Sequence, residues 1–188
     1  MSEHKEEKST SILAITSNLA LAALFSGIVI GAVYFVTAPV AKVKAEEMRV
    51  EALKNLAKDA DTFEDVKGRD GWVAAYSKGA VFAYIVPAET KGYGGIMKLL
   101  VAVSKDGKVL GYTILSHNET PGLGDNANKD FFKDRFKGKT ADDIEIVKDP
   151  SDTKHIEALT GATITSRAVA RAVKQAVEDV MFFRGEGK

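Results

Sequence analysis

The chain has 188 residues, of which 45% are hydrophobic and 28% charged, with a formal net charge of zero; it is long enough for one domain with a substantial core and too short for two large ones. Because no basic surplus or long run of Lys and Arg is present to meet phosphates, binding to DNA or RNA is not expected. Cysteine is absent, which excludes disulfides, thiolate catalysis and cysteine-ligated metal centres. Only three histidines occur, so a histidine-rich metal site is not expected, and redox chemistry would need an organic cofactor.

The N-terminal segment is strongly apolar. No charged residue occurs between Lys8 and Lys42, and residues 12–38 are mostly Leu, Ile, Val, Ala, Phe and Gly. About 20 such residues span a bilayer as a helix, so the sequence predicts a tail over residues 1–11 and a transmembrane helix over residues 12–38. A cleaved signal peptide is the alternative, although its apolar region is usually only about 7–15 residues long. Asn18 inside the span hints at packing against other membrane subunits.

The charges that flank the span leave its orientation open. Lys5 and Lys8 precede it, whereas Lys42, Lys44 and Arg49 follow it, and the positive-inside rule read literally weakly favours a cytoplasmic location for the following part. The tail is too short to fold, so the soluble domain is expected after the anchor.

A helical stalk and two short strands are predicted next. Residues 39–60 are rich in Ala, Glu, Lys and Leu, as helices are, with Pro39 where the span leaves the membrane. Runs of β-branched and aromatic residues predict strands at residues 72–76 and 81–86.

A firmer hairpin follows. Residues 97–104 and 108–116 are strand-like runs separated by Lys-Asp-Gly, and Asp-Gly between apolar runs is a strong turn signal. Residues 129–137 predict a short helix with two phenylalanines on one face, and residues 144–147 predict an edge strand.

The last helix is the clearest element. Apolar residues recur at helical spacing and charged residues fall on the opposite face. The apolar positions are Val169, Ala172, Val173, Ala176, Val177 and Val180, and the charged ones are Arg167, Arg171, Lys174 and Glu178. The predicted fold class is α+β: a single N-terminal transmembrane helix followed by one mixed α/β domain over residues 61–188, with its last helix packed on the sheet.

The entrance to this helix reads Thr160-Gly161-Ala162-Thr163. A helix start presents unpaired N–H groups and the positive end of the dipole, and small residues let an anion approach closely. Thr163 is therefore a candidate anchor for a phosphate-bearing cofactor, with the hydroxyls of Thr165 and Ser166 nearby. The alternative is an ordinary helix cap, for which Thr and Ser are common.

Two glycine-bearing loops flank the predicted strands, at residues 91–95 and 117–125. Glycines allow positive φ and close backbone approach to a flat ligand, and Pro-Gly sets a turn. Each loop taken singly is better explained as a surface turn.

Taken in order, the three segments Gly-Tyr-Gly-Gly, Glu-Thr-Pro-Gly-Leu-Gly and Thr-Gly-Ala-Thr resemble one family. Over essentially its full length, the chain resembles the G subunit of the Rnf complex, an ion-translocating ferredoxin:NAD oxidoreductase, and the related C subunit of the sodium-pumping NADH:quinone oxidoreductase. In that family the last Thr of the motif carries FMN through a phosphoester bond, so the resemblance assigns covalent FMN to Thr163. It also implies a flavin transferase that uses FAD and a divalent metal ion. The attachment signal usually has Asp three residues before the first Ser or Thr, where this chain has Glu157.

The resemblance implies a set of cofactor-binding residues in the three segments. The set comprises Thr160, Gly161, Ala162, Thr163, Thr165, Ser166, Tyr93, Gly94, Glu119, Thr120, Gly122 and Leu123. Tyr93 could stack on the flavin ring or be a simple surface anchor. His117 and His155 have no partner visible in the sequence and are interpreted as structural.

No acid–base pair, nucleophile or metal ligand set for substrate turnover is evident, so the chain is expected to act as a translocase subunit without a complete active site of its own. The function that the resemblance implies is electron transfer within a membrane Rnf-type complex, with other membrane subunits as partners and the soluble domain on the non-cytoplasmic side. The alternatives are a stand-alone membrane-anchored flavoprotein for extracellular electron transfer and a non-enzymatic anchored sensor or scaffold.

Overall fold

The computed structural model describes residues 12–185, and the tail expected over residues 1–11 lies outside the described residues. The chain divides into two units, residues 1–46 and residues 47–188. The first unit contains most of helix α1 (Ile12–Leu56), which continues through Pro39 rather than ending there. This helix is long and apolar enough to cross a membrane, with a mean hydropathy of 2.4 in its most apolar window.

Three hydroxyl groups inside the apolar part of α1 are satisfied within the helix. Thr16, Ser26 and Thr37 donate to the carbonyls of Ile12, Ala22 and Val33, at 2.9, 2.8 and 2.8 Å. A hydroxyl bonded one turn back along the helix can enter an apolar phase without an unsatisfied donor. These residues therefore do not interrupt the predicted span.

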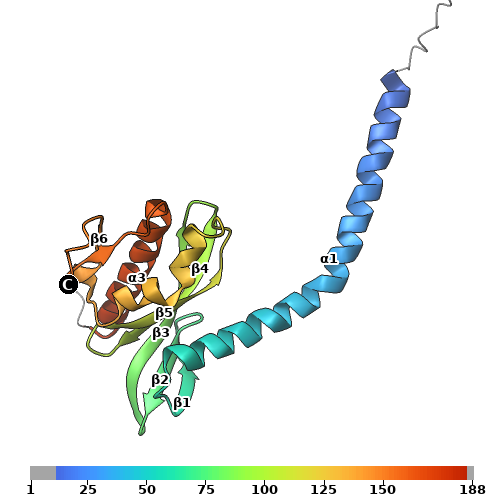
Figure 1. The fold of residues 1–188 in the computed structure, drawn as a ribbon. Helices are drawn as coiled ribbons and strands as arrows, with labels where there is room; N and C mark the ends of the chain where they lie inside the picture. Colours follow the sequence, from blue (N-terminus) through green and yellow to red (C-terminus); the bar gives the residue numbers. More distant parts are fainter. Residues whose placement is uncertain (1–11, 186–188) are drawn as a thin grey trace, which may run out of the picture. The chain divides into compact units, whose positions relative to one another are not determined.

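The second unit is built on an antiparallel sheet of five strands in sequence order (Figure 1). The strands are β1 (Thr62–Asp65), β2 (Val73–Ser77), β3 (Ala80–Lys91), β4 (Ile96–Ser104) and β5 (Val109–Ser116). The hairpin predicted around Asp106-Gly107 is confirmed as β4–β5, and Gly107 has the positive φ of 72° that such a turn favours. The strand expected at residues 81–86 is longer in the structure, and β1 was not predicted.

Shorter elements follow the sheet. They are η1 (Gly124–Asn128), α2 (Asp130–Lys133), η2 (Asp134–Phe136), η3 (Ala141–Asp143), β6 (Ile146–Val147) and β7 (Ile156–Glu157). The helix expected over residues 129–137 is broken into α2 and η2, yet it buries Phe132 and Phe136 together, with ring centroids 5.4 Å apart. The edge strand expected at residues 144–147 is wrong in its placement, because β6 pairs in parallel with β7 in a separate sheet.

The sheet is covered on both faces. Helix α3 (Thr163–Phe183) packs on one face, as the sequence predicts, against a core that includes Leu99 and Val101 of β4. Leu100 and Ala102, which alternate with them, pack on the other face with a cluster that contains Ala52 of α1. This alternation is the period of two that a strand imposes. The residues of α1 from Glu47 onward thus belong to the second unit.

Candidate functional site

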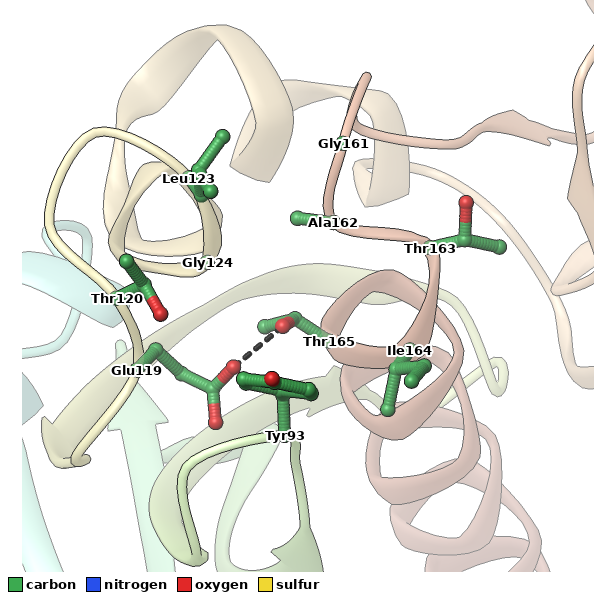
Figure 2. Close-up of a pocket in the computed structure, with 10 residues that line it drawn as sticks. All are labelled: Tyr93, Glu119, Thr120, Leu123, Gly124, Gly161, Ala162, Thr163, Ile164 and Thr165. Carbon is green, nitrogen blue, oxygen red and sulfur yellow. Dashed lines mark hydrogen bonds between the residues drawn. The ribbon is translucent and has the colours of Figure 1, made fainter.

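A cleft of about 490 Å³ opens where the two glycine-bearing loops meet the start of α3 (Figure 2). It is lined by Tyr93, Glu119, Thr120, Leu123, Gly124, Gly161, Ala162, Thr163, Ile164 and Thr165. All three sequence segments that the resemblance singled out therefore contribute to one cleft. Among the residues expected to bind a cofactor, Thr160, Ser166, Gly94 and Gly122 do not line it, and Gly124 and Ile164 were not expected.

Helix α3 begins at Thr163 without a side-chain cap. The N-cap position is taken by Ala162, and no side chain in the described part of the chain makes a capping hydrogen bond there. The first backbone hydrogen bond of the helix runs from the Ser166 N–H to the Ala162 carbonyl at 3.0 Å. The N–H groups that precede Ser166 in the helix therefore have no acceptor within it. The ordinary cap considered for Thr163 is therefore wrong, and the positive end of the helix is free to meet a ligand.

The turn before α3 is held by Ser166 from inside the protein. The Ser166 hydroxyl accepts the Leu159 N–H at 2.9 Å and donates to the Ala162 carbonyl at 3.0 Å. Ser166 is fully buried, so its hydroxyl braces the turn instead of facing the cleft. Gly161 completes this turn with a φ of +76°, a conformation that favours glycine.

Ser166→Ala is expected to lower the free energy of unfolding by about 1–3 kcal/mol, because it leaves the buried Leu159 N–H without its acceptor. Urea unfolding of the detergent-solubilised full-length protein measures this change, with the fluorescence of Trp72, the single tryptophan, as the probe. Ser151→Ala is the control, since Ser151 is exposed, and it is expected to change stability by no more than about 0.5 kcal/mol. Equal losses in the two variants would contradict the bracing role.

Glu119 joins the three segments that form the cleft. One carboxylate oxygen, Oε1, accepts the Gly94 N–H at 2.9 Å, and the other, Oε2, accepts the Thr165 hydroxyl. The Glu119 N–H in turn donates to Nδ1 of His117 at 3.1 Å. Figure 2 shows the Glu119 carboxylate directed toward Thr165. His117 thus has a structural partner in the loop.

The glycines of the two loops are required mainly by contacts between protein segments. A Cβ on Gly94 would lie 1.8 Å from the Asn118 carbonyl oxygen, and one on Gly124 would lie 2.6 Å from Glu119 Oε2 and 2.8 Å from the Thr165 hydroxyl oxygen. The sequence interpretation attributed the loop glycines to positive φ and to close approach of a flat ligand, and Gly95 and Gly122 do have positive φ. In the structure, Gly94 instead lets one loop backbone pass directly against the other.

The mouth of the cleft is apolar. Tyr93, Leu123 and Ile164 line it and remain 71%, 44% and 56% exposed. Ile164 could have been found from the sequence, because it is an apolar residue that falls outside the buried stripe of α3. Exposed apolar side chains around a cleft favour a ligand with a flat apolar part.

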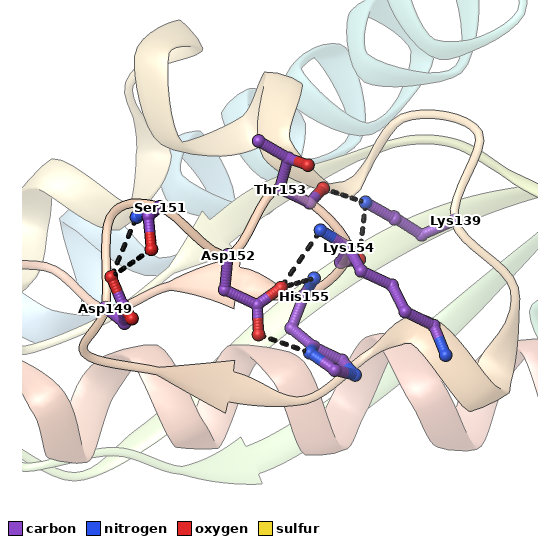
Figure 3. A network of polar contacts seen from close by, with 7 residues as sticks. All are labelled: Lys139, Asp149, Ser151, Asp152, Thr153, Lys154 and His155. Carbon is purple, nitrogen blue, oxygen red and sulfur yellow. Dashed lines mark hydrogen bonds and ion pairs between the residues drawn. The ribbon is translucent and has the colours of Figure 1, made fainter.

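The segment that leads into the cleft is fixed by polar contacts. Arg135 donates to the Glu157 carbonyl at 2.6 Å and forms an ion pair with the Glu157 carboxylate at 3.0 Å. Upstream, Lys139 donates to the carbonyls of Thr153 and Lys154 (Figure 3). These contacts hold β7 and the residues before it.

The same segment contains a local turn around Asp152. The Asp152 carboxylate accepts the backbone N–H groups of Lys154 and His155, and its other oxygen lies 2.7 Å from His155 Nδ1 (Figure 3). Hydrogen bonding from the His155 side chain is the main cause that lowers the pKa of Asp152. His155 is therefore a structural residue of this turn, as the sequence predicts.

Comparisons with known proteins show which proteins this chain resembles. The family described as FMN-binding domain matches residues 92–178, a range that includes every residue lining the cleft. The G subunit of the proton-translocating ferredoxin:NAD(+) oxidoreductase complex of Clostridium ljungdahlii is 52% identical over 181 residues, which cover 96% of this chain and 98% of the relative. The G subunit of the Na(+)-translocating ferredoxin:NAD(+) oxidoreductase complex of Acetobacterium woodii is 40% identical over 54% of this chain and 51% of the relative. The crystal structure of Shewanella oneidensis NqrC matches 69% of this chain and 68% of that chain, with 23% identity and a TM-score of 0.49.

Proposed function

The chain belongs to the family of G subunits of ion-translocating ferredoxin:NAD+ oxidoreductase complexes, and from this premise we propose that its cleft holds FMN tethered to Thr163 by a phosphoester bond. The chain is an electron-transfer subunit of such a complex and carries an FMN-binding domain. Bound FMN supplies the one- and two-electron chemistry that the side chains of the protein lack.

The residues of the cleft fit this cofactor. The N–H groups of the first turn of α3 point out from an uncapped helix start, which is a favourable site for a phosphate. Thr163 is half-buried, lines the cleft and is the first residue of α3, so a phosphoester on its hydroxyl would lie at this helix start. The volume of about 490 Å³ is in the range of roughly 300–1,000 Å³ typical of ligand pockets.

The other lining residues have distinct roles in this proposal. Tyr93, Leu123 and Ile164 contact the flavin ring through their exposed apolar surfaces. Gly161 and Ala162 form the turn that lets the phosphate approach the backbone. Thr165 and Ser166 act indirectly, because their hydroxyls bond to Glu119 and to the turn. The observation that carries the proposal is the uncapped helix start at Thr163, which opens directly into an apolar cleft.

The partners in this proposal are the other membrane subunits of the complex and a flavin transferase. Thr163 lies in the cleft mouth near exposed residues such as Gly161 and Ile164, so a transferase could reach its hydroxyl on the folded domain. The chain covers nearly the full length of a relative that is a complex subunit, which favours this role over a stand-alone flavoprotein. A sensor or scaffold would bind a ligand reversibly or not at all, and would carry no covalent FMN.

The experiment is co-expression of the full chain with a flavin transferase, followed by intact-mass measurement and peptide mapping. The expected result is a mass increase of one FMN less one water, located on the peptide that contains Thr163. An unmodified mass with FMN that is released on denaturation would refute the covalent bond. An unmodified mass with no flavin at all would refute the cofactor itself.

Helix α1 anchors the chain in the membrane as a single pass, and we propose that the domain lies on the non-cytoplasmic side. A covalent tether suits that side, because free FMN lost there would be hard to replace. Alkaline phosphatase fused after Lys188 is expected to be active, since it folds only outside the cytoplasm. A cytoplasmic reporter that is active at the same position would refute this orientation.

A further inference from the structure

Glu119 is the one charged side chain that is buried among residues 12–185, with only 5% of its surface exposed. It lines the cleft, and no Lys, Arg or His within those residues forms an ion pair with it. Its neighbour His117 accepts the Glu119 N–H at Nδ1, so this ring nitrogen is directed at the backbone of Glu119 and not at its carboxylate. The carboxylate is therefore buried without a compensating cation.

The protein is built to hold this carboxylate. Both hydrogen bonds are donated to it, by the Gly94 N–H and the Thr165 hydroxyl, so each of its two oxygens is an acceptor. A Cβ on Gly92 would lie 2.3 Å from Oε1, and a Cβ on Gly124 would lie 2.6 Å from Oε2. The two glycines thus leave space for its two oxygens.

A neutral glutamine would fill the same space and join the same three segments. Its amide oxygen could accept the Gly94 N–H, and its amide nitrogen could donate to the Thr165 oxygen. Burial of a charge without a cation is unfavourable for stability. Packing and hydrogen bonding alone therefore do not explain why the residue carries a charge.

We propose that Glu119 lowers the reduction potential of the flavin by holding a negative charge against it in the cleft. This inference rests on the proposed function, in which the cleft holds FMN. An electron that enters the flavin adds negative charge, and a nearby buried carboxylate disfavours that charge. Glu119 is thus a residue that sets the potential, in addition to joining the loops.

The test is the midpoint potential of FMN in the purified full-length protein, titrated anaerobically with dithionite in the presence of redox dyes. Each FMN takes two electrons from dithionite, which is oxidised to sulfite, and its protons come from the buffer. Glu119→Gln keeps the shape and removes the charge, so its midpoint potential is expected to be more positive than that of the wild type. Glu119→Asp keeps the charge and alters the geometry, so its potential is expected to stay closer to the wild type.

Glu89→Gln is the matched control. It removes the same formal charge from an exposed position, where Glu89 pairs with Lys98 at 3.1 Å, and it is expected to leave the potential unchanged because exposed charges are screened. The flavin-free Glu119→Gln protein is expected to melt at the same temperature as the wild type or higher, since a buried charge has been removed.

Three results would overturn the inference. An unchanged potential in Glu119→Gln would show that the charge does not act on the flavin. Equal positive shifts in Glu119→Gln and Glu119→Asp, or a Glu119→Gln protein that does not fold, would assign Glu119 a structural role only. A wild-type protein with no FMN would refute the proposed function and this inference with it, whereas FMN bound without a covalent bond would leave the potential measurable and would refute only the tether.

Discussion

Thr163→Val is expected to abolish covalent flavin while leaving the domain folded. Valine has nearly the same shape as threonine, and the side chain at this position is half-buried in the first turn of α3, where no cap depends on it. The only chemical group removed is the hydroxyl that would form the phosphoester. A denaturing gel viewed under ultraviolet light, run after co-expression with a flavin transferase, should show a fluorescent band for the wild type and none for the variant.

Thr160→Val is the matched control for this experiment. Thr160 belongs to the same motif and is exposed, yet it does not line the cleft. We expect its fluorescent band to persist, because the hydroxyl of Thr163 is retained. Persistent fluorescence of Thr163→Val, with an unchanged melting temperature in both variants, would contradict the assignment of the tether to Thr163.

Gly94→Ala is expected to have the largest effect on the architecture of the cleft. The new Cβ would lie 1.8 Å from the Asn118 carbonyl oxygen and 2.6 Å from the Asn118 carbonyl carbon. Both are backbone atoms, so no side-chain rotation can relieve the clash, and the two loops must separate. Because Gly94 also donates to Glu119, the separation would break the contact that joins them. We expect a loss of about 3 kcal/mol or more in unfolding free energy, together with weaker retention of FMN.

Gly111→Ala provides the comparison for this substitution. Gly111 is buried in β5, and a Cβ there would meet only the end of the Leu56 side chain, at 3.3 Å. That side chain can move by a few tenths of an ångström, so the loss is expected to be about 1 kcal/mol or less. Urea unfolding measures both variants, and a Gly94→Ala protein as stable as Gly111→Ala would show that the loops are not in contact as described.

Local chemistry explains which parts of the fold could be predicted. The hairpin β4–β5 and helix α3 have sequence signals that agree with their packing, namely an Asp-Gly turn and an apolar stripe. Strand β1 is four residues long and mostly exposed, so no alternating pattern indicates it. Strand β6 has no local signal for its partner, because pairing with β7 depends on the connection held by Lys139 and Asp152.

The sequence predicted which segments form the cleft, but not the contacts between those segments. The motif placed Thr163 at the helix start, but the sequence could not show that Ala162 occupies the N-cap position and that Ser166 turns inward. Likewise, the reason for Gly94 lies in Asn118, far along the chain, and such a contact follows only from the way the sheet brings two loops together. The burial of Glu119 likewise results from the way the sheet brings these two loops together.

The end of α1 determines where the soluble part of this protein can be separated from its anchor. Ala52 and Ala57 are buried in the cluster that covers one face of the sheet, and Leu53 and Leu56 pack against the same cluster. A fragment that starts at residue 61 would expose that apolar face and would be prone to aggregate. A fragment that starts at Glu47 retains the last turns of α1, which cover this face of the sheet. It is the form to prepare for crystallisation or for redox titration in the absence of detergent.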